Sequence, residues 1–399
     1  MSKVEIKKLD SQLRGIGYIN DKIIFVPKTI PGEVCEVEIR KEKKNYQEGH
    51  LLEVLNPSEK RVTPKCPYYS LCGGCDLEHI SYEESVVWKK NMLEELFSRN
   101  HLWTQDIFIE KTDESWNYRN KISLKVQNKK FGYYVVETHS FVEIMECQIA
   151  KKAINDVLKD FSYYAFSNGE IIIRVNENDE ILLDIVTEED ISILEDFVKR
   201  HKIAGILINH KCVYGKPYFF ERKNGVLYQV SMNSFFQVNP YMSEKMFLYV
   251  RKCLKNARNV LDLYCGVGTL GLQLDKSKVN LTGIEVVSSA ILNAISNARL
   301  NQFTNSSFHL GKVEKIIDKI DASYDVIIVD PPRAGLDFFT KETILKTSTK
   351  QIIYISCNPF TLIRDLKELE HEFQLESVQG FDMFPYTKHV ECVCVMSRR

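Results

Sequence analysis

Cys357 stands where a thiol can serve as a nucleophile. The run from Gln351 to Ser356 has strand-forming character, and Asn358 and Pro359 stop that strand directly after the cysteine. The turn would hold the thiol at the carboxyl end of a buried strand. A buried structural cysteine is the commoner role for such a residue. Three other features favour catalysis: an upstream glycine loop, an Asp-Pro-Pro-Arg strand end and a downstream carboxylate.

A glycine loop of the nucleotide-binding type follows the predicted strand 260–263. In DLYCGVGTLG the backbone can approach a ligand, and Glu285 ends the next predicted strand, 19 residues after Gly266. A carboxylate there can accept hydrogen bonds from both ribose hydroxyls, in a dinucleotide or in S-adenosylmethionine. The loop lacks the third glycine of the dinucleotide fingerprint. An Asp-Pro-Pro turn that begins at Asp330 also favours S-adenosylmethionine, because nucleic-acid methyltransferases place such a turn beside the methyl donor and the target base.

A second group of cysteines is more typical of metal ligation than of packing. Cys66, Cys72 and Cys75 lie within KCPYYSLCGGC, on a Gly-Gly turn. Their spacing matches neither the radical S-adenosylmethionine enzymes nor a zinc finger with histidines. Cys147 in MECQIA is the best candidate for a fourth ligand. Four thiolates suit zinc or an iron–sulfur cluster, and the spacing alone leaves both open.

The composition is that of an ordinary globular protein. The 399 residues are 44% hydrophobic and 27% charged, and the formal net charge of −1 means that any nucleic-acid-binding surface must be local. We find no apolar signal region and no run long enough to span a bilayer, so we expect a cytoplasmic protein without membrane contact. Eleven cysteines then indicate thiols and metal ligands rather than disulfides.

Hydrophobic patterning divides the chain into three predicted domains. Residues 1–56 show short strands between turns, which predicts a small OB-like β-barrel. Residues 57–230 mix strand patterns with two helices, which predicts a central α+β domain. Residues 231–399 alternate helices and strands, which is typical of a doubly wound α/β domain. The expected barrel strands are 16–18, 23–26, 34–39 and 49–55, and the expected helices are 82–100, 153–165, 241–254, 288–301 and one that starts at Thr269.

Two clusters of basic and aromatic residues are candidates for RNA contact. The first comprises Arg40, Lys41, Lys43, Lys44 and Tyr46 on one predicted hairpin, and the second comprises Trp116, Tyr118, Arg119 and Lys121. Such clusters can follow a phosphate backbone and stack on bases. A solvated hairpin tip and the rim of a sheet explain them equally well.

These motifs occur together, and in the same order, in a known enzyme family. The chain resembles the bacterial RNA uracil-5-methyltransferases that have an N-terminal TRAM domain and a four-cysteine iron–sulfur site. The resemblance covers essentially the whole chain and is carried by KCPYYSLCGGC with Cys147, SFFQVN, LDLYCGVGTLG, DPPRAGL, YISCNP and HVECV. It implies a class I S-adenosylmethionine-dependent methyltransferase domain behind the TRAM barrel and the central domain.

The resemblance also implies roles for individual residues. Cys357 would be the nucleophile and Glu391 the base. The S-adenosylmethionine contacts would be Gln237, Tyr264, Glu285 and Asp330, and the ligands of a [4Fe-4S] cluster would be Cys66, Cys72, Cys75 and Cys147. Lys312 departs from the acidic or amide residue that many relatives have near the adenine, so it is not included in the cofactor set.

The implied reaction is methylation of uracil C5 in RNA. A thiolate that adds at C6 makes C5 nucleophilic enough to attack a sulfonium methyl, and a base then removes the C5 proton. We expect Arg333 to lower the pKa of Cys357. Because the four-cysteine relatives mostly act on large-subunit ribosomal RNA, the expected substrate is 23S rRNA. No DNA binding is expected, and the protein is expected to be a monomer.

Four alternatives remain open at this stage. One is a uracil-5 enzyme for the T-loop of transfer RNA. An adenine or guanine N-methyltransferase would use the Asp-Pro-Pro turn and need no cysteine. A cytosine-5 enzyme is disfavoured, because its thiol follows proline or threonine rather than a serine such as Ser356. A non-catalytic RNA-binding module would keep the barrel and the cluster without binding S-adenosylmethionine.

Overall fold

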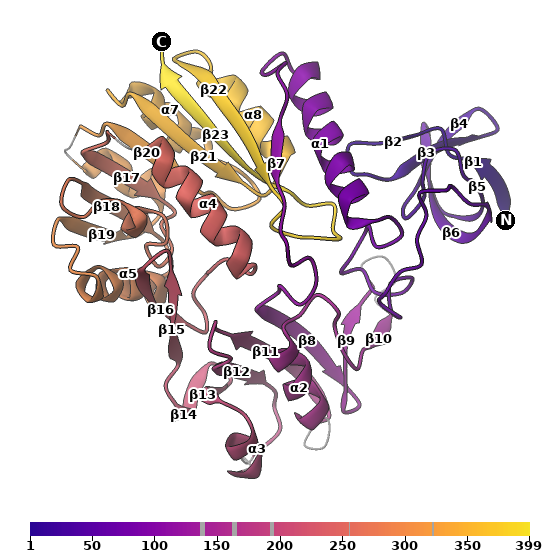
Figure 1. Ribbon diagram of the computed structural model, residues 1–399, viewed down its shortest axis with the longest axis horizontal. Coiled ribbons are helices and arrows are strands. Elements are labelled where there is room, and N and C mark those ends of the chain that lie inside the picture. The colour runs from indigo at the N-terminus through magenta and orange to yellow at the C-terminus, as the bar shows by residue number, and fades with distance from the viewer. Residues whose placement is uncertain (136–139, 162–165, 192–194, 255, 321–322) are drawn as a thin grey trace.

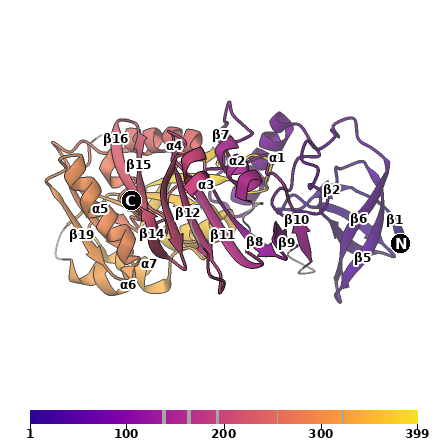
Figure 2. The ribbon, with the colours of Figure 1, turned by 90° about the horizontal axis from the view of Figure 1, so that it is seen from below.

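The computed structural model describes residues 1–135, 140–161, 166–191, 195–254, 256–320 and 323–399. These residues form three large β-sheets and one hairpin. The N-terminal sheet lies to one side, the C-terminal sheet to the other, and the central sheet below them in Figure 1. The view from below in Figure 2 shows that the molecule is elongated, with the N-terminal strands at one end.

The N-terminal sheet is curled around a small core of its own. Its strand order is β1-β5-β6-β4-β3-β2. Alternate residues such as Ile24 and Val26 are fully buried in that core, as expected of strands with one face inside. The strands are β1 (Ser2–Glu5), β2 (Lys8–Leu9), β3 (Gly15–Ile19), β4 (Lys22–Val26), β5 (Val34–Glu42) and β6 (Tyr46–Asn56). The last four match the predicted strands, whereas β1 and β2 were not predicted.

The central sheet has seven strands in the order β10-β9-β8-β11-β12-β13-β14. They are β8 (Lys121–Gln127), β9 (Lys130–Tyr134), β10 (Phe141–Glu143), β11 (Asn168–Val175), β12 (Ile181–Val186), β13 (Ile203–Ile208) and β14 (Lys211–Gly215). Helix α2 (Lys152–Phe161) and the short α3 (Glu195–Arg200) accompany it. The last four residues of the predicted helix 153–165 lie outside the described residues, and α3 was not predicted. A hairpin of β15 (Tyr218–Lys223) and β16 (Val226–Ser231) leads onward.

The C-terminal sheet has eight strands in the order β19-β18-β17-β20-β21-β23-β22-β7. They are β17 (Asn259–Leu263), β18 (Asn280–Glu285), β19 (Ser306–Leu310), β20 (Val326–Val329), β21 (Gln351–Ser356), β22 (Phe373–Phe381), β23 (Glu391–Arg398) and β7 (Phe108–Glu110). The strands from β19 to β21 run parallel, and β23 is antiparallel to β21. This arrangement confirms the predicted doubly wound α/β class.

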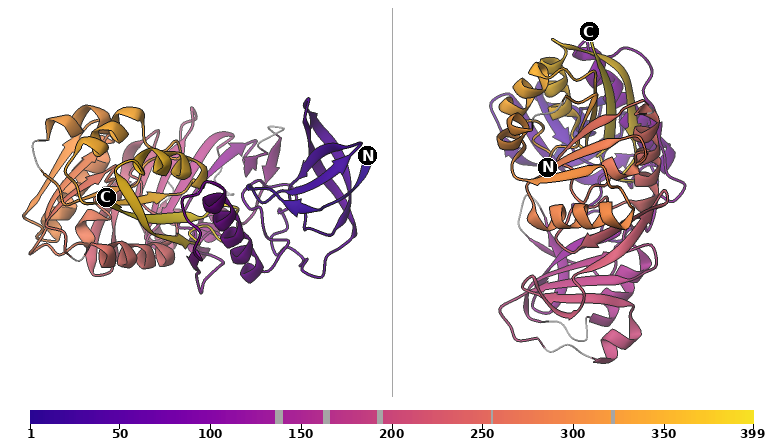
Figure 3. Two further views of the ribbon diagram at one scale, coloured as in Figure 1. Left: turned by 90° about the horizontal axis from the view of Figure 1, so that it is seen from above. Right: turned by 90° about the vertical axis from the view of Figure 1, so that its left-hand side faces the viewer.

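Helices cover both faces of this sheet. The helices are α4 (Pro240–Cys253), α5 (Ser288–Leu300), α6 (Val313–Ile316), α7 (Phe338–Lys346) and α8 (Pro359–Leu369). Along β21, Ile352 and Tyr354 pack with α7 and α8, whereas Ile353 and Ile355 pack with α4 and α5. Because successive side chains of a strand point to opposite faces, burial on both sides produces the continuous apolar run seen in the sequence. Figure 3 shows the helices on either side.

Helix α1 (Tyr82–Arg99) fastens the segment after the barrel to the C-terminal sheet. Its N-cap Ser81 accepts a hydrogen bond from the Glu84 backbone N–H at 3.2 Å. Its buried side chains share one core with α8, and β7 pairs with β22. Lys89 and Asp382 also form a completely buried ion pair at 2.6 Å. These contacts therefore join residues that lie far apart in the chain. The domain boundaries remain predictions from the sequence.

The glycine loop differs from its prediction. No α-helix starts at Thr269, and only a short 3-10 turn, Gly271–Gln273, follows the loop. A Cβ at Gly271 would meet Leu281 Cδ1 at 2.6 Å, so this segment packs tightly against β18. In the part of the chain that the structure describes, no helix has the length and apolar character needed to cross a membrane.

Candidate active site

The strand register brings the predicted nucleophile and base together. Ser356 pairs with Cys392 across the antiparallel strands β21 and β23. The paired residues end there; the same register continued by one residue would set Cys357 opposite Glu391, the first residue of β23, and the effect of the Glu391 carboxyl on the thiol pKa agrees with that placement. Directly opposed residues have Cβ atoms about 5 Å apart. Asp330 follows β20, the parallel neighbour of β21, so it reaches the same edge of the sheet.

Hydrogen bonds fix the turn that carries the thiol. Asn358 caps α8 by accepting from the Phe360 backbone N–H at 3.2 Å, and its own backbone N–H donates to Ser356 Oγ at 3.1 Å. The Asn358 side-chain amide donates to the Arg333 carbonyl at 3.0 Å. The thiol turn and the Asp-Pro-Pro-Arg turn are thereby held against each other.

The Cys357 thiol opens into a cavity of about 210 Å³. Burial raises the pKa of Cys357 to about 11, and the carboxyl of Glu391 adds to the rise. Arg333 lies beside the thiol and opposes this shift, as expected, but the net direction is upward. The effect expected of Arg333 is present, but burial and Glu391 together outweigh it.

The two carboxyl groups of the site are both shifted upward. Burial and the nearby Asp330 raise the pKa of Glu391 well above its ordinary range, and Arg333 counteracts part of the rise. Burial raises the pKa of Asp330 to about 7. A raised pKa means that such a carboxyl group holds a proton more tightly once it has accepted one, although it must be ionised first to act as a base. His389, on the cavity wall, has its pKa lowered to about 4 by burial and by Arg333.

The glycine loop forms an open cradle beside these groups. Gly266 has φ +56°, and a Cβ there would meet nothing within 4 Å. The Gly266 backbone N–H donates to Glu285 at 3.1 Å, which places that carboxylate at the mouth of the loop. Tyr264, with φ +62°, directs its ring toward the core shared with α7 and α8, and burial raises its pKa to about 12.

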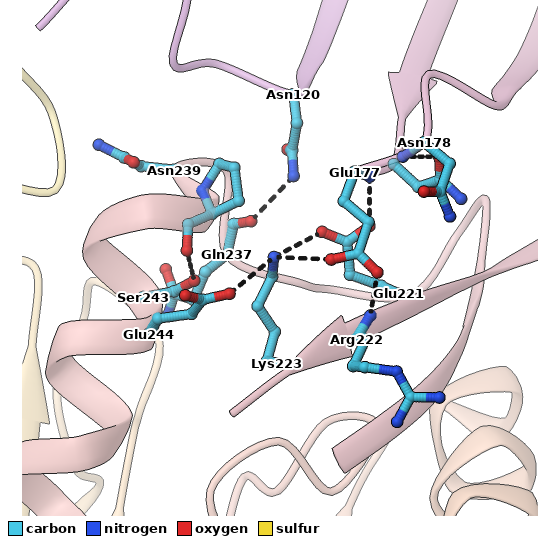
Figure 4. A network of polar contacts seen from close by, with 12 residues as sticks. Asn120, Glu177, Asn178, Glu221, Arg222, Lys223, Gln237, Asn239, Ser243 and Glu244 are labelled. Atoms are coloured by element: carbon cyan, nitrogen blue, oxygen red, sulfur yellow. Dashed lines mark hydrogen bonds and ion pairs between the residues drawn. The ribbon is translucent and has the colours of Figure 1, made fainter. Parts of the chain in front are cut away.

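Gln237 comes from the loop between β16 and α4. It is 6% exposed, and its carbonyl accepts from the Asn120 side-chain amide at 3.4 Å. Figure 4 shows the neighbouring network, in which Lys223 forms ion pairs with Glu221 at 2.9 Å and Glu244 at 3.4 Å. The network ties the β15–β16 hairpin to α4, and so steadies the loop that carries Gln237.

Sequence reasoning missed a buried carboxyl in the same region. Asp262, on β17, is 1% exposed; its Oδ2 accepts from the Gly271 backbone N–H at 3.1 Å, while its Oδ1 has no hydrogen-bond partner among the described residues. Burial raises the pKa of Asp262 to about 8, with Asp330 and Glu285 adding to the rise. The available signal was a charged residue inside an otherwise apolar strand run. Lys312, by contrast, is exposed and pairs with Glu314 at 3.8 Å.

The four predicted metal ligands surround one cavity of about 270 Å³. They are Cys66, Cys72, Cys75 and Cys147. Burial raises the pKa of all four thiols, that of Cys66 to about 11. Within the described ranges, no three His, Cys, Asp or Glu side chains converge closely enough to hold a single metal ion. Arg333 and His389 line this cavity as well as the thiol cavity, so the two sites share a wall.

Comparison with known proteins decides the family. A family model described as tRNA (Uracil-5-)-methyltransferase matches residues 175–399, and a TRAM domain model matches residues 2–52. The chain belongs to the RNA uracil-5-methyltransferase family. Both matches confirm the resemblance seen in the sequence. In this methyltransferase the TRAM match coincides with the curled N-terminal sheet, and the longer match contains the thiol turn, the Asp-Pro-Pro-Arg turn and the glycine loop, whereas the four predicted metal ligands lie outside both matches.

Individual relatives agree with this assignment. Uncharacterized RNA methyltransferases of Halalkalibacterium halodurans and Staphylococcus aureus are 31% and 33% identical to this chain. The first match covers 97% of this chain and 94% of the relative, and the second covers 96% and 95%. A solved structure, the Pyrococcus abyssi tRNA (uracil-54, C5)-methyltransferase in complex with S-adenosyl-L-homocysteine, is 25% identical, covers 99% of both chains and superposes with a TM-score of 0.81.

Proposed function

We propose that this protein transfers a methyl group from S-adenosylmethionine to C5 of a uracil in RNA, through a covalent bond between Cys357 and uracil C6. The observation that carries the proposal is the meeting of Cys357, Glu391, Asp330 and Arg333 at one sheet edge, next to an open glycine loop. An N-methyltransferase would need neither the thiol nor a carboxyl opposite it. A cytosine-5 enzyme is disfavoured by the family match.

The residues of the glycine loop fit the methyl donor. S-adenosylmethionine supplies an electrophilic sulfonium methyl group when bound. Glu285 would accept hydrogen bonds from its ribose hydroxyls, and the open space at Gly266 admits it close to the backbone. Gln237, Tyr264 and Asp330 are the other proposed contacts.

The reaction then follows from the chain's own groups. The Cys357 thiolate forms a bond to C6, and the displaced electron pair makes C5 nucleophilic. C5 takes the methyl group, and S-adenosylhomocysteine leaves. Glu391 removes the C5 proton, the C5–C6 double bond forms again, and the thiolate departs. Arg333 stabilises the negative charge on sulfur before addition and after release, which is the role its position beside Cys357 supports.

Cys66, Cys72, Cys75 and Cys147 are proposed to hold a [4Fe-4S] cluster. The support for this proposal is that four half-buried thiols line one cavity of about 270 Å³, and four thiolates are the usual ligands of such a cluster. The methylation needs no electron transfer, so the cluster would brace the wall that contains Arg333 and His389. Iron analysis of protein purified without oxygen tests this assignment.

We propose 23S rRNA as the substrate. The basis is the combination of a TRAM domain with four cysteines around one cavity. Transfer RNA is the second candidate, favoured by the likeness to the Pyrococcus abyssi tRNA (uracil-54, C5)-methyltransferase. The cytoplasmic location and the monomeric state stay predictions.

The experiment compares two unmodified transcripts, 23S rRNA and transfer RNA, incubated with enzyme and S-adenosylmethionine. Nucleosides are then analysed by mass spectrometry. We expect 5-methyluridine in the 23S transcript and none with Cys357→Ala. If 5-methyluridine formed only in transfer RNA, transfer RNA would take the place of 23S rRNA as the proposed substrate. Methylation that persists in Cys357→Ala would refute the proposed covalent mechanism.

A further inference from the structure

The turn between β2 and β3 is built rigidly for an exposed loop. We call residues 10–14 the barrel tip. The Asp10 carboxylate accepts from the backbone N–H groups of Gln12 at 2.9 Å and Arg14 at 2.8 Å, and it also pairs with the Arg14 guanidinium at 2.7 Å. Leu13 adopts φ +59°, a left-handed conformation that is costly for a branched side chain.

Leu13 explains how the barrel tip is held in place. Its side chain is 5% exposed, and it belongs to the same core cluster as Trp88 and Met92 of α1 and Leu362 of α8. The backbone strain at Leu13 is therefore offset by burial in a core that does not belong to the barrel. The barrel tip is fastened to the methyltransferase part of the molecule.

This attachment places two polar residues in the catalytic cavity. Ser11 and Gln12 line the cavity of about 210 Å³ that also contains Cys357, Arg333 and His389. Gln12 is exposed, and in the described part of the chain its side-chain amide makes no hydrogen bond to the protein. An amide with both donors and an acceptor is suited to contact a base edge, a ribose hydroxyl or a phosphate oxygen.

We propose that the barrel tip, through the Gln12 amide, contacts the RNA nucleotide that carries the reacting uracil and positions it over Cys357. The inference rests on the proposed function and extends it, because the N-terminal barrel then acts at the reacting nucleotide itself. Gln12 is a positioning residue, since it does not take part in bond making. A tip that merely fills space would not depend on the chemistry of the amide.

The test uses full-length enzyme with unmodified 23S rRNA transcript, and unmodified transfer RNA in parallel. Gln12→Ala removes the side chain, and Gln12→Met keeps its size but not its hydrogen bonds. The matched control is Gln105→Met, an exposed glutamine in the loop after α1 that does not line the thiol cavity. Single-turnover methylation rate at saturating RNA, the Kd for RNA, and S-adenosylmethionine binding by calorimetry are measured for each variant.

We expect both Gln12 variants to lower the single-turnover rate about tenfold, the effect of one hydrogen bond of ordinary strength. The Kd for RNA and the binding of S-adenosylmethionine should change less than about twofold. The control should match wild type. A wild-type rate in either Gln12 variant, or a loss confined to RNA affinity, would overturn the inference. If wild-type enzyme produced no 5-methyluridine in either RNA, the proposed function itself would fail.

Discussion

The thiol of Cys357 should react slowly with alkylating reagents at neutral pH, although it is the proposed nucleophile. Its pKa of about 11 follows from burial and from Glu391, against the opposing effect of Arg333. At pH 8 a thiol with that pKa is about one part in a thousand thiolate, whereas a free cysteine is about one quarter thiolate. A thiolate of higher pKa is intrinsically more nucleophilic, by about tenfold for this difference. The net expectation is a rate about 20-fold below that of a free cysteine.

The assay is alkylation by iodoacetamide, followed by peptide mass spectrometry over pH 7 to 11. Cys212 is an exposed thiol of the same chain and serves as the internal reference. The Cys357 rate should rise about tenfold for each pH unit up to pH 10 and level near pH 11. Arg333→Ala should lower the Cys357 rate at pH 8 further, by about three- to tenfold, because the variant loses the cation that favours the thiolate. The expected change is moderate because the Arg333 side chain is partly exposed to solvent, which weakens its effect on the thiol.

A Cys357 rate that levels below pH 9, or that equals the Cys212 rate at pH 8, would refute this reasoning. It would mean that Arg333 outweighs burial and that the thiolate is preformed. The enzyme would then need no help from bound RNA to ionise its nucleophile. If the Cys357 rate in Arg333→Ala also levelled below pH 9 or equalled the Cys212 rate at pH 8, Arg333 would be excluded as the cause of the preformed thiolate.

Three further predictions concern the groups around the site. Asp262 has a pKa of about 8 in the folded state, above its unfolded value of 3.8, so the folded state prefers the protonated carboxyl. Relative to Asp262→Asn, wild type should therefore lose about 4 kcal/mol of unfolding free energy between pH 5 and pH 8. Urea titrations in which the stability difference between the two proteins stays constant with pH would contradict this. Lys89→Met leaves the Asp382 carboxylate buried and unpaired, so it should lower the unfolding free energy by about 3–5 kcal/mol. The double variant Lys89→Met with Asp382→Leu should recover much of that loss. Equal melting curves for Lys89→Met and wild type would contradict this prediction. Cys147→Ala should remove the iron and the visible absorbance of anaerobically purified protein, while Cys253→Ala keeps both; zinc in place of iron would exclude the cluster.

Much of the C-terminal domain could be predicted because its signals are local. The apolar run that ends at Ser356 and the alternation of helices with strands depend on neighbouring residues, and β21 has the predicted bounds. The pairing of Cys357 as nucleophile with Glu391 as base came only from the family resemblance, and the strand register then brings the two residues to the same end of the sheet. The family motifs supplied their order.

Features that depend on distant contacts could not be read from local patterns. Strand β7 has only three residues and exists because β22, more than 260 positions away, offers an edge. The segment expected to form a helix from Thr269 has only the short 3-10 turn Gly271–Gln273, in which Gly271 packs tightly against Leu281 of the neighbouring strand. The pKa of Cys357 depends on how far the folded chain buries the thiol, and the presence of Arg333 in the sequence does not reveal that burial. The barrel tip has no sequence signal that points toward the catalytic cavity.

The covalent step can be measured directly with RNA that contains 5-fluorouridine. Fluorine replaces the C5 proton that Glu391 would remove, so the enzyme cannot release the thiol after methyl transfer. We predict a stable protein–RNA adduct in the presence of S-adenosylmethionine, with the methylated fluorouridine attached to the peptide that contains Cys357. The absence of any adduct, or an adduct on another cysteine, would contradict the account.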